Sequence, residues 1–504
     1  MKKYFLILVS VIVLISISGC TPRGTPAARA GVARDSVTIS VEAPWSTMDP
    51  HLTTTFVNMY PINQLYEALT HVLDDGTVIP WLADSWTISP DGRVYTFQLK
   101  QGVRFHNGEP FTASDVAFSY ERARTTPHMR DNTAAISNIN VISDHVLEVT
   151  LGVPFAPFLS YMANVYIINE KFFNENDENL GRVACGTGPY TLDSIEMNTV
   201  AVMRAFPDYH RGEARIKNLT FRVFLDYATA NMALRAGEID FYSPTAAQLV
   251  ELRADPNFHT ASLPTLHIAH IALNQNVPPF DNVLVRQALN YAMDRQTSVL
   301  VSFEGLAVPA RLMVSESAFG VNYAHAREYP YNLDRARQLL AEAGYPQGLN
   351  LGTMYTLAST YHEIIGQVFQ SSCAQIGVTF DLLPMESTTL INMMIAGDFA
   401  FGNMGQGFQT DFAFGSRFYT TGSTVNYANY ANPRVDELFA LAEVETDPAT
   451  RLRYYNEVVS IITNDAVNIP VQHREAFFAW VPGLNIVPRA EMGRPYYVHD
   501  WYWD

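Results

Sequence analysis

The chain has 504 residues, of which 48% are apolar, 12% aromatic and 16% charged. This length exceeds the size at which a single hydrophobic core stops growing, so the composition predicts a folded protein of two or three domains and excludes a disordered chain. The formal net charge of −17 argues against nucleic acid or an anionic surface as the partner.

The first nineteen residues have the pattern of a secretory signal. Lys2 and Lys3 form a positive start, and the apolar run 5–17 follows. The run is shorter than the roughly 20 residues that span a bilayer, which favours a cleaved signal over an uncleaved anchor. Residues 20–35, which include many Pro, Ala, Gly and Thr, are expected to form a flexible tether.

The next segments predict a strand, a hairpin and a helix in that order. Residues 36–41 alternate polar and apolar side chains, as in a half-buried strand, and the strand breaks into a loop at Pro44. Residues 90–92 (Pro-Asp-Gly) form a turn that precedes a second alternating run, which indicates a hairpin. Thr112, with Asp115 three residues later, predicts a capping box at the start of a helix.

The middle of the chain predicts a strand followed by a helix. Residues 266–273 are a short, largely apolar run, and Pro278 with Pro279 prevents its continuation. Asp281 or Asn282 can then cap a helix whose apolar residues recur at three-to-four spacing. Upstream, residues 218–243 predict strand, helix and strand, a crossover unit of an α/β domain.

Further helices in the second half begin with an Asn or Asp cap. Asn332 caps one helix, and Asn432 and Asp447, each followed by Pro, begin two more. Between them, residues 399–423 combine five glycines with several Phe side chains. This composition favours the rim of a binding pocket, and a long surface loop is the alternative.

No enzyme motif stands out. The segment 185–190, CGTGPY, lacks the third glycine of a dinucleotide site and is expected to be a turn. His362 has no second His at the spacing of a zinc helix, and His267 and His270 would face opposite sides of a strand. We therefore expect no catalytic residues, no metal site and no cofactor.

Cysteine usage does not indicate a disulfide. Besides Cys20, only Cys185 and Cys373 are present, and the two are expected on different lobes. Both are expected to be small buried side chains.

Several segments resemble one family. PPFDNVLVRQALNYAMDR, at 278–295, is similar to a segment that marks the peptide and nickel solute-binding proteins (family 5), the extracytoplasmic receptors of ABC importers, among them dipeptide- and oligopeptide-binding lipoproteins. Further sequence motifs of the family occur in the same order, at 74–124, 186–190, 427–445 and 468–480. The resemblance covers residues from about 36 to 490.

The resemblance implies a fold and a domain division. The fold is α/β, two-lobed and periplasmic-binding-protein-like (class II), with a small α/β subdomain inserted in the first lobe. The expected division is 1–19 signal, 20–35 tether, 36–73 with 185–275 and 481–504 as lobe I, 74–184 as inserted subdomain, and 276–480 as lobe II. Two crossings, near 273–276 and 479–483, would form the hinge.

The resemblance also implies a cellular location. The residues ISGC resemble the lipobox of bacterial lipoproteins, in which Cys20 is lipidated and becomes the mature N-terminus. A single acyl chain binds a membrane only marginally, so the multiple chains implied by the family would hold the protein firmly. The expected location is extracytoplasmic, anchored to a bacterial membrane.

The resemblance suggests which residues bind the ligand. The loop after the first strand lines the pocket in the family, although Trp45 serves equally well as a cover for the edge of a core. Dipeptide-binding members carry a Trp and then an Asp that anchors the peptide amine, and here Gln406 occupies the Trp position while Gln409 or Asp411 occupies that of the Asp. The candidates are Trp45, Ser46, Thr47, Tyr355, Gln406, Phe408, Gln409, Asp411 and His473.

The implied function is capture of a small solute between two lobes and its delivery to the permease subunits of an ABC importer. A peptide is the first candidate for this solute. The protein would act as a monomer, without a nucleic-acid partner. The alternatives are a binder of an oligosaccharide or a metal chelate, a signalling receptor without transport, and a secreted hydrolase.

Overall fold

The structure is a computed structural model that describes residues 34–73, 76–176, 179–316, 318–407, 411–488 and 497–504. Residues 35–504 form one compact unit. The predicted signal, the tether, Cys20, Phe408 and Gln409 lie outside the described residues. Within them, the largest sheet has eleven strands in the order β8-β9-β10-β1-β11-β17-β12-β16-β14-β15, with β13 beside β17.

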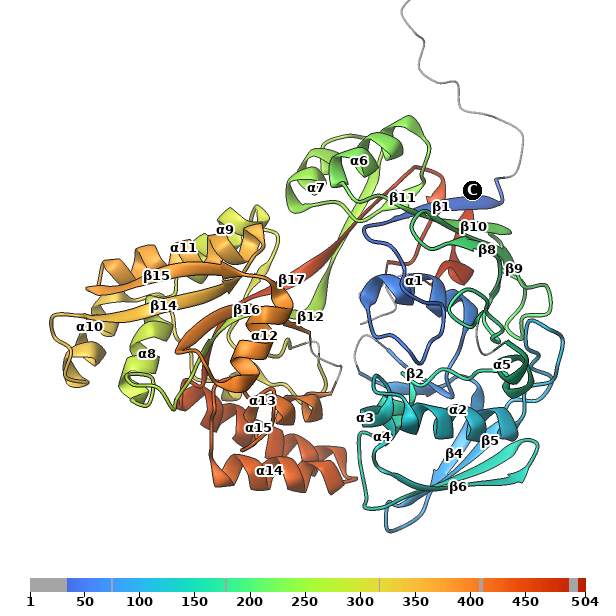
Figure 1. The fold of residues 1–504 in the computed structure, drawn as a ribbon, viewed down its shortest axis with the longest axis horizontal. Helices are drawn as coiled ribbons and strands as arrows, with labels where there is room; N and C mark the ends of the chain where they lie inside the picture. Colours follow the sequence, from blue (N-terminus) through green and yellow to red (C-terminus); the bar gives the residue numbers. More distant parts are fainter. Residues whose placement is uncertain (1–33, 74–75, 177–178, 317, 408–410, 489–496) are drawn as a thin grey trace, which may run out of the picture. The chain divides into compact units, whose positions relative to one another are not determined.

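The first half of this sheet belongs to a part that we call lobe I (Figure 1). Its strand β1 pairs in parallel with β10 and β11, as a crossover unit requires. Three short elements at the C-terminus complete it. The elements are β1 (Ser36–Val41), α1 (Phe56–Leu65), β8 (Tyr190–Glu196), β9 (Val200–Ala205), β10 (Asn218–Val223), α6 (Tyr227–Ala236), β11 (Phe241–Tyr242), α7 (Ala246–Arg253), β18 (Leu484–Asn485), η4 (Val498–Asp500) and β19 (Tyr502–Trp503).

A separate antiparallel sheet, in the order β4-β5-β7-β6, forms with its helices what we call the subdomain. Its own hydrophobic cluster includes Phe97, Val116 and Leu147, one from each of two strands and one from a helix. The elements are β2 (Thr70–Val72), β3 (Val78–Pro80), β4 (Ala83–Ile88), β5 (Val94–Leu99), α2 (Ala113–Thr125), α3 (Arg130–Thr133), β6 (Ile136–Ser143), β7 (Val146–Leu151), α4 (Phe158–Met162) and α5 (Glu170–Asn176).

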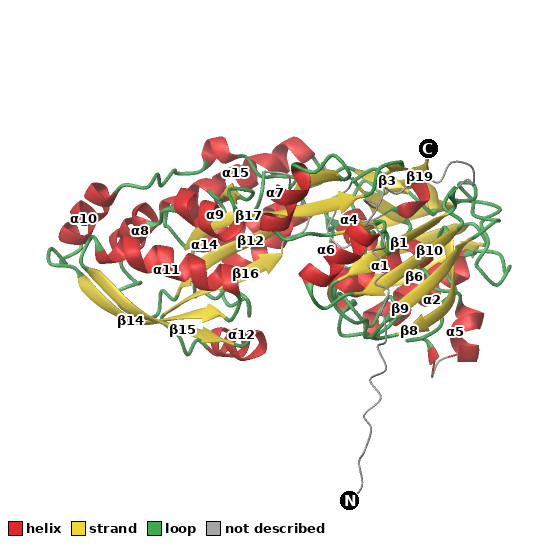
Figure 2. Cartoon of the chain, turned by 90° about the horizontal axis from the view of Figure 1, so that it is seen from above, coloured by secondary structure: helices red, strands yellow, loops and turns green. Residues whose placement is uncertain are grey.

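The second half of the large sheet carries helices on both faces and is called lobe II (Figure 2). Ala269 and Ile271 of β12 pack with α8, α10 and α11, whereas Ala272 packs with α12 on the opposite face. The elements are β12 (His259–Leu273), α8 (Val283–Ala292), α9 (Arg295–Phe303), β13 (Val308–Pro309), η2 (Tyr323–His325), α10 (Leu333–Glu342), β14 (Leu349–Leu357), α11 (Thr360–Ala374), β15 (Val378–Met385), α12 (Ser387–Ala396), β16 (Phe401–Gly407), η3 (Phe412–Gly415), α13 (Ser416–Tyr419), α14 (Pro433–Val444), α15 (Pro448–Asn464) and β17 (Asn468–Trp480).

Two long antiparallel strands, β12 and β17, join the lobes. The first half of β12 pairs only with the end of β17, which in turn pairs with β11 of lobe I, and the second half of β12 pairs with β16 of lobe II. The register shifts between Pro264 and Ile268. The strands β12 and β17 therefore pair with strands of both lobes, and the crossings near 273–276 and 479–483 remain a prediction.

Local sequence patterns correctly predicted where four helices begin and the capping box of α2. Asn282 caps α8, Asn332 caps α10, and Asn432 and Asp447 cap α14 and α15 ahead of their prolines. The backbone N–H of Thr112 donates to Asp115 Oδ2 at 3.0 Å, which confirms the capping box.

Close packing requires the glycines in the predicted turn at 185–190. A Cβ on Gly186 would lie 2.0 Å from the carbonyl oxygen of Leu65, so only glycine fits against this backbone. Cys185 and Cys373 are both free and buried, as predicted, and belong to different hydrophobic clusters.

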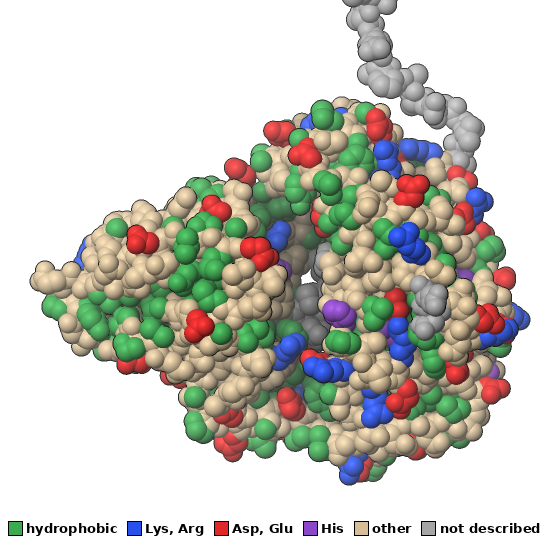
Figure 3. All heavy atoms as spheres, viewed as in Figure 1, with side chains coloured by type: hydrophobic (Ala, Val, Ile, Leu, Met, Phe, Trp, Pro, Cys, Tyr) green, Lys and Arg blue, Asp and Glu red, His purple; other side chains and the backbone are tan. Residues whose placement is uncertain are grey.

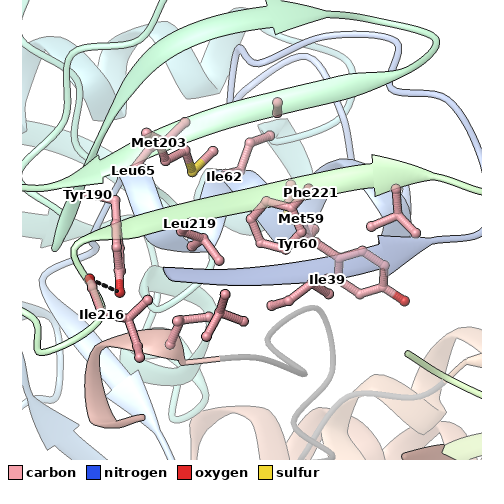
Figure 4. Packing of buried hydrophobic residues seen from close by; sticks show 14 of the residues in the cluster. Ile39, Met59, Tyr60, Ile62, Leu65, Tyr190, Met203, Ile216, Leu219 and Phe221 are labelled. Carbon is pink, nitrogen blue, oxygen red and sulfur yellow. Dashed lines mark hydrogen bonds between the residues drawn. The ribbon is translucent and has the colours of Figure 1, made fainter. Parts of the chain in front are cut away.

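The core of lobe I lies between the sheet and α1. Figure 4 shows Ile39, Leu219 and Phe221 from the strands facing Ile62 and Leu65 from the helix. The hydroxyl of Tyr190 enters this core and donates to the Ile216 carbonyl at 3.0 Å, which satisfies a polar group that burial would otherwise penalise.

The expectation for residues 399–423 needs a correction. Their first part is the interior strand β16, and Phe401, Phe412 and Phe418 are buried in the core instead of lining a pocket or a surface loop. Their glycines serve strand packing as well, because a Cβ on Gly402 would lie 3.3 Å from the Tyr355 carbonyl. The glycines favour the rim of a pocket over a strand in a sequence-based prediction, because glycine is uncommon in the interior of a strand.

Candidate functional site

Among the described residues, the two lobes meet at the pair of strands β12 and β17, and beside these strands α7 packs with α9. The subdomain contacts the end of α14, where the backbone N–H of Ala156 donates to the Glu443 carbonyl at 2.7 Å. A hollow lies between the lobes (Figure 3). The space-filling view shows the face hollowed beside β17 and below α6 and α7, with Lys or Arg side chains on its wall (Figure 3). A solute held there would touch both lobes.

Arg474 of β17 is held against two aromatic rings. Its guanidinium carbon lies 5.2 Å from the ring centroid of Tyr361 and 5.7 Å from that of Phe303. The side chain is partly exposed, and its Nε is buried without a hydrogen-bond partner among the described residues. Stacking on aromatic faces fixes the direction of the guanidinium, and Arg474 also makes a hydrogen bond to the Tyr361 side chain.

Glu42, the residue after β1, carries the opposite charge. Tyr60 donates its hydroxyl to Glu42 Oε1 at 3.1 Å, and no cation within the described residues lies at ion-pair distance. Burial raises the pKa of the Glu42 carboxyl, and the nearby positive charge of Arg474 opposes that rise. Burial raises the pKa of the Tyr227 hydroxyl, the charge of Glu42 adds to that rise and the charge of Arg474 opposes it. Both Glu42 and Tyr227 are exposed.

Behind Arg474, the backbone of β16 comes close to three rings. A Cβ on Gly405 would lie 2.8 Å from His267 Cε1, 3.3 Å from His362 Nε2 and 3.3 Å from the Tyr361 hydroxyl. Burial, followed by the charge of Arg474, lowers the pKa of His267 to about 4, and burial lowers that of His362 to about 3. Both imidazoles are therefore neutral near pH 7, which leaves Arg474 as the cation of this group.

The three candidates in the loop after β1 differ in exposure. The Trp45 side chain is 3% exposed and belongs to the core of lobe I. Thr47 is 9% exposed and its hydroxyl accepts from the Asp49 backbone at 3.0 Å. Ser46 alone is exposed, and its hydroxyl accepts from Asn58 Nδ2 at 2.7 Å. Of the three, only Ser46 is placed to touch a solute without rearrangement.

Asp411 has a complete set of partners inside lobe II. One oxygen, Oδ2, accepts from Arg451 at 2.6 Å, and the other accepts from the Tyr455 hydroxyl at 3.2 Å and from the Ala413 backbone at 2.8 Å. Burial raises the pKa of this carboxyl, while Arg451 and the hydrogen bonds oppose the rise. The network has no free acceptor directed at a peptide amine, which favours Gln409 for the position of the family's Asp.

The other candidates lie on lobe II. Gln406 and His473 both pair with Ile268 and therefore share one face of the sheet. His473 is 4% exposed and its Nε2 is 3.1 Å from the Tyr323 hydroxyl, whereas Gln406 and Tyr355 are partly exposed. Arg474, the next residue after His473, lies on the opposite face.

Sequence reasoning therefore missed Arg474, Glu42 and Tyr361. Arg474 lies inside a segment that was recognised for its resemblance, but no local pattern distinguishes an arginine that faces a cleft from one that faces solvent. The available indication was a charged residue in a strand that is otherwise largely apolar.

Two searches of the described residues bear on the class of site. They contain no group of three or more His, Cys, Asp or Glu side chains arranged to hold a metal ion. They also contain no helix that is both long and apolar enough to cross a bilayer.

Comparisons with known proteins agree with this architecture. The family model of the bacterial extracellular solute-binding proteins, family 5 Middle, matches residues 77–428. The glutathione-binding protein GsiB of Salmonella typhimurium is 29% identical over 469 residues, covering 88% of this chain and 90% of GsiB. GsiB of Escherichia coli strain K12 is 27% identical and covers 87% and 89%, respectively.

Solved structures share the fold. HbpA2 of Haemophilus parasuis is 25% identical, with a TM-score of 0.84 over 93% of this chain and 100% of HbpA2. DppA of Helicobacter pylori, a periplasmic binding protein solved with the peptide STSA, is 24% identical, with a TM-score of 0.78 over 94% and 98%. These matches confirm the predicted two-lobed α/β fold, and GsiB and DppA are named as binding proteins.

The family match, at residues 77–428, covers more than half of the chain. Two lobes joined by paired strands and separated by a hollow are what capture of a solute requires. This chain belongs to the family 5 bacterial extracellular solute-binding proteins.

Proposed function

We propose that this protein captures a peptide or a peptide-like compound and delivers it to the membrane permease of an ABC importer. The observation that carries the proposal is the similarity, over 88% of the chain, to proteins named for binding glutathione, itself a small peptide. The cation Arg474 and the exposed carboxyl of Glu42 support it, because peptides carry both of the opposite charges that such groups can bind.

The mechanism is closure of the lobes about β12 and β17. A solute that touches one lobe only has equal affinity for open and closed states, so it cannot shift the equilibrium between them. A solute that bridges lobe I and lobe II favours the closed state, which the permease then recognises.

Our proposal for the binding surface keeps Ser46, Tyr355, Gln406, Phe408 and Gln409 as solute contacts. Trp45, Thr47, Asp411 and His473 support it from behind, since each is buried. The division into lobe I, the inserted subdomain at 74–184 and lobe II at 276–480 belongs to the same proposal.

The proposed location follows from the N-terminal sequence. Cys20 becomes lipidated after removal of residues 1–19 and holds the mature chain, as a monomer, at the outer side of a bacterial membrane. Labelling with a radioactive fatty acid tests this: wild type is expected to incorporate label and Cys20→Ala is not. Equal labelling of both proteins would reject the lipid anchor.

The central test uses protein without its signal and lipid. Mass spectrometry of small molecules released by denaturation is expected to reveal peptides, and adding the same peptides back is expected to raise the Tm. Intact peptides after prolonged incubation would exclude hydrolysis. If the released molecules are sugars or metal chelates, and no peptide raises the Tm, that class of compound would be the solute instead of a peptide.

A second measurement separates transport from signalling. Bacteria that use the identified peptide as their nitrogen source are expected to lose growth on it when this gene is deleted. Unchanged uptake together with a lost transcriptional response to the peptide would identify a signalling receptor instead.

A further inference from the structure

Two helices from different lobes pack on each other beside the strands that join the lobes. α7 belongs to lobe I and α9 to lobe II, and both contact β17 (Figure 1). Leu249 of α7 lies in one hydrophobic cluster with Val299 and Phe303 of α9 and with Phe477 of β17. Leu249 is fully buried, and each of the other three side chains is no more than 8% exposed. An apolar contact therefore joins the lobes in addition to the paired strands.

Buried hydrogen bonds fasten α9 to β17. The hydroxyl of Ser298 donates to Gln472 Oε1 at 3.1 Å, and Gln472 Nε2 donates to Ser302 Oγ at 2.9 Å. Ser298 and Gln472 are fully buried. The ring centroid of Phe303 also lies 5.4 Å from that of Tyr361 in α11. α9 is therefore expected to move together with this part of β17 and with α11 of lobe II.

α7 is fastened to lobe I in a similar way. Its fully buried Leu252 lies in a second cluster with Leu234 of α6 and Tyr242 of β11. Gln248 Nε2 donates to the carbonyl of the first residue of α6 at 3.0 Å. α7 is therefore expected to move with lobe I, although Leu249, one turn before Leu252, lies in the cluster shared with α9.

The strand pair is irregular between these two attachments. α9 is bonded to β17 at Gln472, and α7 shares its cluster with Phe477 of the same strand. Opposite the intervening residues, the pairing of β12 with β17 shifts register between Pro264 and Ile268. An interrupted ladder is a place where a strand bends. Bending there would separate α7 from α9 and expose their apolar side chains to water, which costs free energy.

We propose that α7 and α9 form an apolar latch across the joining strands, which keeps the two lobes in this relative position before a solute binds. Because the latch already favours one arrangement, the solute has less free energy to supply, and its apparent affinity rises with the fraction of molecules in that arrangement. The latch itself does not depend on the proposed function, whereas its effect on solute affinity rests on that function.

Leu249 and Leu252 provide a matched pair of variants. Both are fully buried leucines of α7, but only Leu249 lies in the cluster shared with α9. Leu249→Ala removes apolar contact from the latch, whereas Leu252→Ala removes a similar contact inside lobe I. We expect both variants to lower the unfolding midpoint, and only Leu249→Ala to change the distance between the lobes.

Electron paramagnetic resonance between two spin labels measures that distance without a solute. Asn198→Cys, in the turn between β8 and β9, and Ala341→Cys, on α10, place one label at an exposed position of each lobe. Cys20→Ala leaves Cys185 and Cys373 as the native thiols, and both are buried.

The labelled wild type is expected to give one main distance. Leu249→Ala is expected to give about equal populations at this distance and at a longer one, whereas Leu252→Ala is expected to keep the wild-type distribution. Val299→Ala, on the lobe II side of the latch, is expected to resemble Leu249→Ala and tests the same contact if Leu249→Ala does not fold. The double variant is expected to change less than the sum of the two, because each single change already breaks the shared contact.

Affinity for glutathione, used as the peptide probe, is the second measurement. With about half of the molecules in the binding-competent arrangement, Leu249→Ala is expected to bind glutathione about twofold more weakly than Leu252→Ala. Saturating glutathione is expected to restore the wild-type distance in Leu249→Ala, because the bound solute replaces the latch in favouring that arrangement.

The outcomes separate the latch from the proposed function. The latch is rejected if Leu249→Ala and Val299→Ala keep the wild-type distances, if Leu252→Ala changes them equally, or if most wild-type molecules already show the longer distance. In each of these cases the proposed function stands as long as peptides bind. If no peptide binds but only the latch variants change the distance, the latch stands and the proposed function is rejected.

Discussion

Asp411 and Arg451 form a largely buried ion pair in lobe II, whereas Glu42 and Arg474 carry opposite charges on an exposed and a partly exposed side chain. The Asp411 carboxylate accepts hydrogen bonds from Arg451, Tyr455 and a backbone N–H, so its bonding capacity is used inside the lobe. Glu42 and Arg474 remain apart and lack ionic partners among the described residues. The difference teaches that a carboxylate whose hydrogen bonds are made inside a lobe stabilises the fold, whereas a charge without an ionic partner remains able to bind a solute.

The largest expected effect tests the satisfied pair. Asp411→Ala leaves the guanidinium of Arg451 buried without its carboxylate, and loss of one partner of a buried pair costs about 3–5 kcal/mol. We expect urea denaturation to show a decrease of that order in the free energy of unfolding. Asp334→Ala, which breaks an exposed pair with Arg337, is the control and is expected to change little. A fully stable Asp411→Ala protein with lost solute affinity would place Asp411 in the binding surface instead.

The second prediction concerns the packing behind Arg474. Gly405→Ala would put a Cβ within 2.8 Å of His267 and 3.3 Å of the Tyr361 hydroxyl, so the aromatic support of Arg474 must shift. Overpacking of this kind costs about 1–3 kcal/mol, and we expect affinity for the solute to fall as well. Gly397→Ala is the control for the loss of a glycine, because a Cβ there meets no atom within 4 Å, although its φ of 78° adds strain. Unchanged solute affinity in Gly405→Ala would separate this backbone from the site.

The third prediction concerns pH. Burial lowers the pKa of His270 to about 3 in the folded protein, whereas the unfolded side chain titrates near 6.5. Below pH 6.5 the unfolded state binds the extra proton, so stability is complete above that pH and decreases as pH falls toward 3. His270→Phe removes this proton uptake, and we expect its loss of stability between pH 6.5 and 5 to be smaller by about 1–2 kcal/mol. His128→Phe, at an exposed position, is the control, and parallel profiles for all three proteins would contradict the prediction.

The smallest effect is expected at a charge that is satisfied and exposed. Arg434 lies 2.8 Å from both Glu437 and Glu457, at the surface of α14 and α15. Because solvent screens such pairs, Arg434→Ala is expected to keep both the unfolding midpoint and the solute affinity of wild type. A clear loss of affinity would mean that surface charge contributes to solute capture, which would weaken the distinction between satisfied and unsatisfied charges.

The sequence by itself determined most of the local structure and the family. Caps such as Asn282 and Asn432 act within one helical turn, and strand alternation acts over a few residues, so both can be seen in the order of residues alone. The segment at 278–295 identified the family because turn, cap and core positions occur there together, and the comparison confirmed it.

The tertiary structure alone decided which charges are free. Glu42 and Arg474 lie 432 positions apart, from the difference of their numbers, and only the pairing of β17 with β11 and β12 brings the charge of Arg474 near Glu42. In the same way, Arg451 reaches Asp411 only because α15 packs beside η3, which removes that carboxylate from the solute. Whether a charged group is satisfied depends on partners that are distant in sequence, and a local pattern contains no information about them.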